Sequence, residues 1–173
     1  AASILATTAT LHQPTKERLT VTLGLFSSDY EKINSATALR LTIWKTAYSI
    51  FKEHPINGIG PRGFRYAYTE FAEPGDYFIE KNVPPTQPHL LILEIITETG
   101  LIGLTGFLLL CYFLIKSTNY IVHSSYGSVF LIPVLVAIFP FNAHMAVYGS
   151  IWSSMIWLLI AFYIATLKLS FFK

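Results

Sequence analysis

The sequence predicts an all-α integral membrane protein, with about three transmembrane helices and a largely helical polar segment at residues 13–88. Hydrophobic residues make up 53% of its 173 residues and charged residues only 13%, about half of what a water-soluble domain carries. The charges are also unevenly placed, because no Asp or Glu follows Glu98 and the only bases after it are Lys116, Lys168 and Lys173. The chain therefore divides into a polar half and an apolar half.

Charge and cysteine content exclude some classes of protein. The net charge is +2 and the bases are interleaved with acids, so no basic patch supports a nucleic-acid partner. Cys111 is the only cysteine, which excludes an intrachain disulfide. The chain begins at Ala1 without a basic stretch before an apolar core, so we predict no signal peptide. We expect it to be the C-terminal part of a longer membrane protein.

The polar half is expected to hold two helices. Residues 1–12 are small, apolar and Thr-rich, as at the end of an upstream span or in a loop approaching one. The first helix is predicted to start at Asn34 or Ser35 and to end near Glu53, because His54-Pro55 disfavours its continuation.

A turn at residues 57–61 follows, and then a short helix from Pro61. Its apolar stripe would be Phe64, Tyr68 and Phe71. Residues 73–88 contain Pro-Gly, Pro-Pro and Gln-Pro pairs, which predict an irregular loop.

The apolar half, residues 89–173, is expected to form the membrane domain. A helix from Pro88 to Ile115 would be about 42 Å long and would exceed the bilayer core of about 30 Å. Its first two turns, with Glu94 and Glu98, would then stand outside a span at about 95–115. Two further spans are predicted at about 128–145, bent at Pro133 and Pro140, and at 151–167.

Two further expectations concern how these spans sit in the bilayer. Gly103 and Gly106 would let another helix approach the first span closely. The three lysines of this half flank the spans on the side opposite to residues 13–88, which the positive-inside rule makes cytoplasmic.

Four short motifs occur in order along the chain: Arg40 with Trp44, His54-Pro55-x-x-Gly58-x-Gly60, Pro88-His89, and the pair Gly100 and Gly103. In this order and spacing the sequence resembles the O-antigen ligase and O-antigen polymerase superfamily of bacterial envelope glycosyltransferases. The resemblance covers about residues 38–110 and extends more loosely through 139–150. Leu90 departs from the Asn, Ser or Gln that ligases often have after the histidine, which affects the subtype.

The resemblance implies an inner-membrane, multi-pass enzyme whose active site faces the periplasm, with residues 13–88 as a periplasmic loop domain. Such enzymes transfer a glycan from a polyprenyl (undecaprenyl) diphosphate to an acceptor hydroxyl such as that of lipid A-core, with no metal and no cofactor. Polymerase and protein O-oligosaccharyltransferase activities remain open within the superfamily. A non-catalytic membrane transport or assembly module is the alternative from another class.

The residues agree with such a reaction. Asp29 and Asp76 are far apart in the chain, so no aspartate pair suggests a metal site. A single arginine guanidinium, by contrast, can bind two phosphate oxygens at once. Arg40, Arg62 and Arg65 are the candidates for the diphosphate.

His89 is the candidate base. It follows Pro88, so we expect it in the first turn of the long helix, where the positive helix terminus favours the neutral ring that accepts a proton. The free N–H groups of that turn could also hold an anion.

Three further residues have both a functional and an ordinary structural explanation. Glu94 is either the partner of an arginine or a solvated carboxylate. His54 is either a cation at a helix end or a catalytic group. His144 either lines the acceptor cleft or belongs to a wet loop. Tyr148, Trp152 and Trp157 are read as interfacial anchors.

Overall fold

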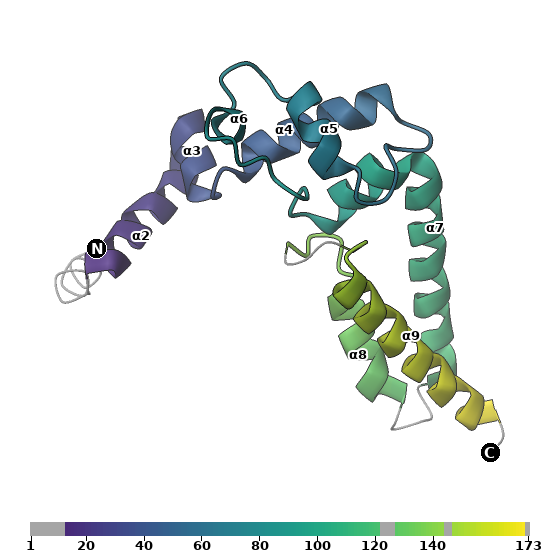
Figure 1. Cartoon of the computed structure of the whole chain (residues 1–173). Helices are drawn as coiled ribbons and strands as arrows, with labels where there is room; N and C mark the ends of the chain where they lie inside the picture. Colours follow the sequence, from purple (N-terminus) through teal and green to yellow (C-terminus); the bar gives the residue numbers. More distant parts are fainter. Residues whose placement is uncertain (1–12, 122–126, 144–146, 172–173) are drawn as a thin grey trace. The chain divides into compact units, whose positions relative to one another are not determined.

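A computed structural model describes residues 13–121, 127–143 and 147–171 (Figure 1). All regular secondary structure in these ranges is helical, as predicted. The chain divides into two compact units, Ala1–Ile43 and Trp44–Lys173, and each is described by itself. The expectation for residues 1–12 lies outside the described residues.

The first unit contains α2 (Gln13–Leu23), the 3-10 helix η1 (Gly24–Phe26), α3 (Tyr30–Ala36) and the start of α4 (Arg40–Glu53). The prediction of one helix starting at Asn34 or Ser35 is wrong. Ala38 and Leu39 have φ angles of 56° and 61°, and right-handed helix cannot pass through such residues. Asn34 lies inside α3 instead, and its side chain bonds both the backbone N–H and the hydroxyl of Thr42 in the first turn of α4.

In the second unit, α4 ends at Glu53 directly before His54-Pro55, as predicted. Helix α5 (Phe64–Phe71) has the expected apolar face, with Phe64 and Tyr68 buried, but it begins three residues after Pro61. A four-residue helix, α6 (Tyr77–Glu80), interrupts the predicted irregular loop. Asp76 starts α6 by accepting hydrogen bonds from Phe78 N and Ile79 N, and its other oxygen accepts one from the Tyr68 hydroxyl at 2.8 Å.

The long apolar helix α7 (Leu91–Ile121) is broken at Gly100, whose φ and ψ are 62° and −157°. Figure 1 shows the change of direction between its two arms, the upper arm before Gly100 and the lower arm from Gly100 to Ile121. The helix begins three residues later than predicted, because His89 has a φ of 52°. A residue in that left-handed region cannot belong to the first helical turn.

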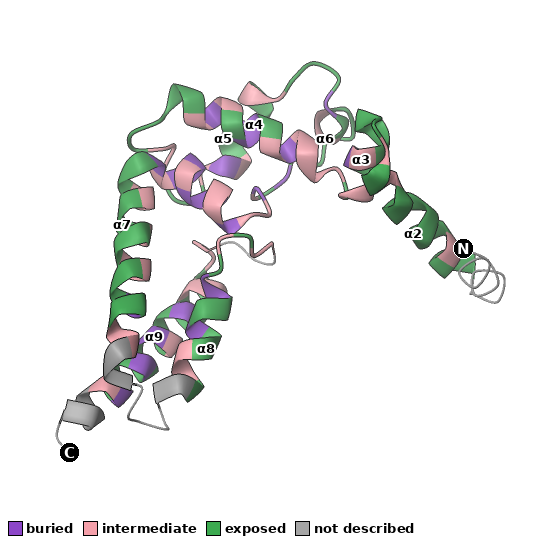
Figure 2. Cartoon of the chain, turned by 180° about the vertical axis from the view of Figure 1, so that it is seen from behind, coloured by how far each residue is buried: buried purple, intermediate pink, exposed green. Residues whose placement is uncertain are grey.

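Two more helices complete the second unit: α8 (Gly127–Ala137) and α9 (Ser150–Phe171). They pack on each other and on the lower arm of α7, with Leu114, Val134 and Tyr163 in the core. Much of that arm's surface is exposed (Figure 2), and its exposed residues are mostly apolar.

Two helices in the described ranges are long and apolar enough to cross a membrane, over Leu91–Thr118 and Ser150–Leu167. They correspond to the first and third predicted spans. The second prediction, a span to about residue 145, is wrong at its end, because α8 stops at Ala137 and the chain turns through residues 138–142.

Candidate functional site

The turn that follows α4 lies on the break in α7 and forms four backbone hydrogen bonds with it. Ile59 N and Gly60 N donate to Thr97 O and Glu98 O, at 3.1 and 2.8 Å. In the other direction, Leu101 N donates to Pro55 O at 2.8 Å and Ile102 N to Ile56 O at 3.2 Å. A helix end leaves carbonyl and N–H groups without helical partners. The turn supplies partners to two of each kind, so it stabilises the break.

Two glycines of the turn and the break make this contact possible. A Cβ atom on Gly58 would lie 2.4 Å from the carbonyl carbon of Glu98, and one on Gly100 would lie 2.2 Å from the carbonyl oxygen of Ile56. Both glycines also have positive φ angles. The Gly58 and Gly100 of the sequence motifs therefore bring two backbone segments together.

Glu98 fastens the next segment to the same place. Its side chain is 1% exposed, and its oxygens accept hydrogen bonds from Arg62 N and Phe64 N at the start of α5. Glu98 is not among the site residues that the sequence predicts. The signal in the sequence was a carboxylate within a mostly apolar helix, because a buried charge needs hydrogen-bond donors from elsewhere in the chain.

Arg62 and Arg65 are carried by this fastened segment. Arg62 is exposed and Arg65 is half-buried. Both lie close enough to Glu98 for their charges to act on its carboxylate. The Nε atom of Arg65 is buried without a hydrogen-bond partner among the described residues. The structure thus brings two of the three predicted arginines to the break of α7.

His89 lies in the loop just before α7. The Trp44 indole N–H donates to the carbonyl oxygen of buried Pro88 at 3.0 Å, which fixes the backbone directly before His89. Gln87 Nε2 lies 3.2 Å from His89 Nδ1. The imidazole is half-buried, so it is neither enclosed in the core nor fully in solvent.

The first-turn N–H groups of α7 have other partners than predicted. Leu91 N and Ile92 N donate to Asn142 O and Pro140 O, each at 3.0 Å. The expectation that these two groups would be free to hold an anion is therefore wrong. They join the start of α7 to the segment that follows α8.

Glu94 is a second buried carboxylate on the upper arm of α7. It is 2% exposed and accepts hydrogen bonds from the backbone N–H groups of Val147 and Tyr148. The interpretation of Glu94 as a solvated carboxylate is therefore wrong. The Tyr148 hydroxyl lies 3.0 Å from Thr99 Oγ1, so both ends of this arm hold the segment that leads into α9.

The remaining predicted residues lie elsewhere. His54 is exposed at the end of α4, with its ring edge-on to Phe71 at 6.0 Å, in a shallow polar groove with Lys52 and Glu70. Arg40 is half-buried at the first position of α4 and belongs to the first unit. His144 lies outside the described residues.

The upper arm of α7 separates two groups of candidate residues. It runs from Leu91 to the residue before Gly100, about 13 Å at 1.5 Å per residue. His89 and Glu94 belong to its start, whereas Arg62 and Arg65 belong to its end. Among the described residues, no group of three or more His, Cys, Asp or Glu side chains could hold a metal ion.

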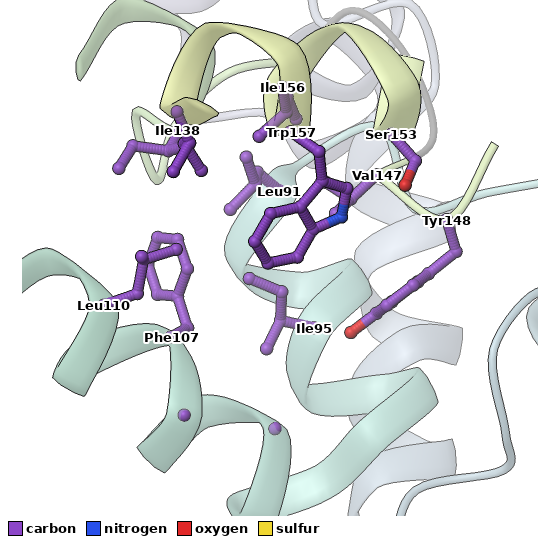
Figure 3. A pocket seen from close by; sticks show the side chains of 13 residues that line it. Leu91, Ile95, Phe107, Leu110, Ile138, Val147, Tyr148, Ser153, Ile156 and Trp157 are labelled. Atoms are coloured by element: carbon purple, nitrogen blue, oxygen red, sulfur yellow. The ribbon is translucent and has the colours of Figure 1, made fainter. Parts of the chain in front are cut away.

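An apolar cavity of about 270 Å³ is lined by both arms of α7, with Leu91 and Ile95 from the upper arm and Gly103, Gly106, Phe107 and Leu110 from the lower arm (Figure 3). The Tyr148 and Trp157 rings turn into it in this view, and Ile95 lines it from α7. The polar side-chain atoms among the lining residues are the Tyr148 and Ser153 hydroxyl oxygens and the Trp157 indole nitrogen (Figure 3). The lining is made by α7, α9 and the residues that follow α8: Leu91, Ile95, Gly103, Gly106, Phe107, Leu110, Ile138, Val147, Tyr148, Ser153, Ile156, Trp157 and Ile160.

Together these features describe an all-helical protein with two helices long and apolar enough to cross a membrane, in which a polar, arginine-bearing segment is bound to the first of these helices. The sequence profile described as O-antigen ligase matches residues 3–108, and the chain belongs to the O-antigen ligase family. This confirms the resemblance seen in the sequence motifs.

Several rickettsial proteins with the provisional name polysaccharide ligase are similar to this chain. The one from Rickettsia conorii is 31% identical over 141 residues, which cover 78% of this chain and 33% of the relative. A relative from Rickettsia typhi is 36% identical over 101 residues, covering 58% and 25%. The chain thus spans about a third of the length of the first relatives. No solved structure matches it.

Proposed function

We propose that the full-length protein transfers a glycan from a polyprenyl-diphosphate carrier to an acceptor hydroxyl at the periplasmic face of the inner membrane, as an O-antigen ligase acting on lipid A-core. Membership of the O-antigen ligase family, over residues 3–108, is the observation that carries this proposal. The names of the rickettsial relatives support ligation of a polysaccharide as the reaction class.

His89 is the proposed general base. Its half-buried ring, on a loop held by Trp44 and Gln87, suits a group that must meet a substrate in a fixed orientation. The acceptor oxygen attacks the anomeric carbon and forms the new glycosidic bond, while its proton passes to His89. The bond from the anomeric carbon to the diphosphate oxygen breaks, and the carrier leaves as polyprenyl diphosphate.

Arg65 and Arg62 are proposed to bind the diphosphate as its negative charge grows. The buried Nε of Arg65 supports this role, because it has no hydrogen-bond partner among the described residues and a phosphate oxygen would supply one. The upper arm of α7 separates the two groups, so these side chains must extend along it to share a substrate with His89. The assignment of Arg40 rests on the resemblance alone. This mechanism uses no metal ion.

The apolar cavity beside α7 is proposed to take the first isoprene units of the carrier. Its lining is almost wholly hydrocarbon, with polar atoms at the Tyr148 end. A lipid chain there would keep the diphosphate at the Tyr148 end of the cavity, next to Thr99 at the end of the arm where Arg62 and Arg65 lie. Glu94 would contribute indirectly, by holding the segment that carries Tyr148.

The test of His89 uses the full-length protein in a bacterial host that lacks its own O-antigen ligase. We expect His89→Ala to lower glycan transfer to lipid A-core by about 10²- to 10⁴-fold, the usual contribution of a general base. Membrane insertion should remain unchanged. Thr86→Ala is the matched control, because Thr86 is exposed in the same loop.

Gel separation and mass spectrometry of the lipids measure the products. Glycan that accumulates on the carrier in the His89→Ala strain supports a ligase, whereas loss of all long chains indicates a polymerase. Transfer at the wild-type rate by His89→Ala would contradict the proposed base.

A further inference from the structure

The ring of His89 contacts a side chain that the proposed reaction has not yet used. Gln87 is half-buried, and Pro85 and Pro88 on either side of it are both buried. Its amide nitrogen lies 3.2 Å from His89 Nδ1. A segment with two buried prolines has few alternative backbone conformations, so Gln87 and His89 keep a nearly fixed spacing.

An amide is well suited to a ring that changes its protonation state. The NH₂ group of Gln87 can donate to Nδ1, in which case the proton of the neutral ring is on Nε2. After rotation of the amide, its oxygen accepts from Nδ1–H, and Nε2 then has a lone pair for the acceptor hydroxyl. The same oxygen accepts from Nδ1–H once Nε2 has taken the proton.

We propose that Gln87 is a positioning residue, which orients the imidazole of His89 and, with its amide rotated so that the oxygen accepts from Nδ1–H, holds the neutral form whose Nε2 accepts the proton. This inference rests on the proposed function of His89 as base. Gln87 touches neither donor nor acceptor, and it acts only through the ring.

Charged side chains on the elements around His89 must be taken into account when its pH dependence is measured. On the part of α7 before Gly100 they are Glu94 and Glu98, whose oxygens accept backbone hydrogen bonds. On the part of α4 in the same unit they are Lys45, Lys52 and Glu53, of which Lys45 pairs with Glu73 at 2.9 Å. The segment 139–142, which meets the start of α7, contributes carbonyl oxygens.

Two replacements of Gln87 by side chains of similar volume distinguish orientation of the His89 ring from simple packing against it. Gln87→Met keeps the volume but removes both hydrogen-bonding groups, and we expect kcat to fall about tenfold at every pH, with the KM for the donor unchanged. Gln87→Glu keeps an oxygen that accepts from Nδ1–H. We expect this variant to recover the wild-type rate at alkaline pH.

The sign of the pH effect follows from charge. A carboxylate beside the ring favours the imidazolium, which cannot act as a base. The acid limb of the kcat/KM profile should therefore move to higher pH in Gln87→Glu, by about one unit. In Gln87→Met the limb should move little, and the rate should stay low throughout.

The experiment uses the full-length protein with purified lipid-linked glycan, and Thr86→Ala as control. A wild-type kcat for Gln87→Met, or a Gln87→Glu profile that superimposes on the wild type, overturns the proposal. If His89→Ala is inactive while both Gln87 variants behave as wild type, only the role of Gln87 fails. If His89→Ala is active, the proposed base fails as well.

Discussion

Replacing Gly100 by alanine should be among the most damaging small changes in the chain, because two separate penalties coincide there. Gly100 has φ 62° and ψ −157°, a backbone region that essentially only glycine adopts, and a non-glycine residue there costs about 1–3 kcal/mol. The new Cβ would also lie 2.2 Å from Ile56 O. Relief requires the turn to move away, with loss of the bonds from Leu101 N and Ile102 N, about 1 kcal/mol each. We expect Gly100→Ala to lower the free energy of unfolding by about 3–5 kcal/mol.

Two other glycines provide matched controls that separate the penalties. Gly60 has a φ of 90° but no atom within 4 Å of its Cβ position, so Gly60→Ala should lose only the backbone part, about 1–2 kcal/mol. Gly106 has neither problem, and Gly106→Ala should match the wild type or gain up to about 1 kcal/mol from helix propensity.

Unfolding of the full-length protein in mixed micelles would rank these variants. Hydrogen exchange at the Leu101 and Ile102 amides would report the break directly, with faster exchange expected in Gly100→Ala. Equal stability of Gly100→Ala and Gly106→Ala, or unchanged exchange at both amides, would refute the reasoning.

Two further predictions concern hydrogen bonds. Trp44→Phe removes the donor to Pro88 O and should lower kcat about fivefold, with a loss of about 1 kcal/mol in the free energy of unfolding. Tyr48→Phe is the control, because Tyr48 lies on the exposed side of α4. Equal kcat values for the two variants would contradict the role of the Trp44 hydrogen bond. Tyr68→Phe removes the donor to buried Asp76 and should cost about 1–3 kcal/mol at pH 8, measured by unfolding. Burial and the bond to Asp76 raise the pKa of Tyr68 well above its usual range. The protonated phenol therefore stabilises the fold below pH of about 10, the unfolded value, and this stability is lost at higher pH. The gap between wild type and Tyr68→Phe should narrow at pH 11, and a gap that widened would contradict the assignment.

The features that sequence analysis predicted correctly have local causes. His54-Pro55 disfavours helix, and α4 ends directly before this pair. The apolar stripe of α5 follows from residues four positions apart, and Phe64 and Tyr68 are buried as expected. Helix α9, at the place of the third predicted span, comes from a long and mostly apolar run that is long enough to cross a membrane.

The features it missed depend on partners far away in the chain. The break at Gly100 is stabilised by a turn about forty positions earlier, and no helical periodicity reveals such a partner. Glu98 has the same difficulty, because its donors are 34 and 36 positions away. The left-handed His89 follows a proline that suits a helix start, so local preference favoured the wrong boundary.

The contact between Gly58 and Gly100 also has an evolutionary consequence. When a new methyl group collides with a side chain, a smaller neighbour can restore the fit. Here the obstacles are a peptide carbonyl and a peptide nitrogen, which every amino acid carries. A second mutation that restores function to a Gly58 or Gly100 variant would have to change the length or path of the turn. A selection for such suppressors should therefore yield insertions and deletions in the turn instead of nearby point substitutions.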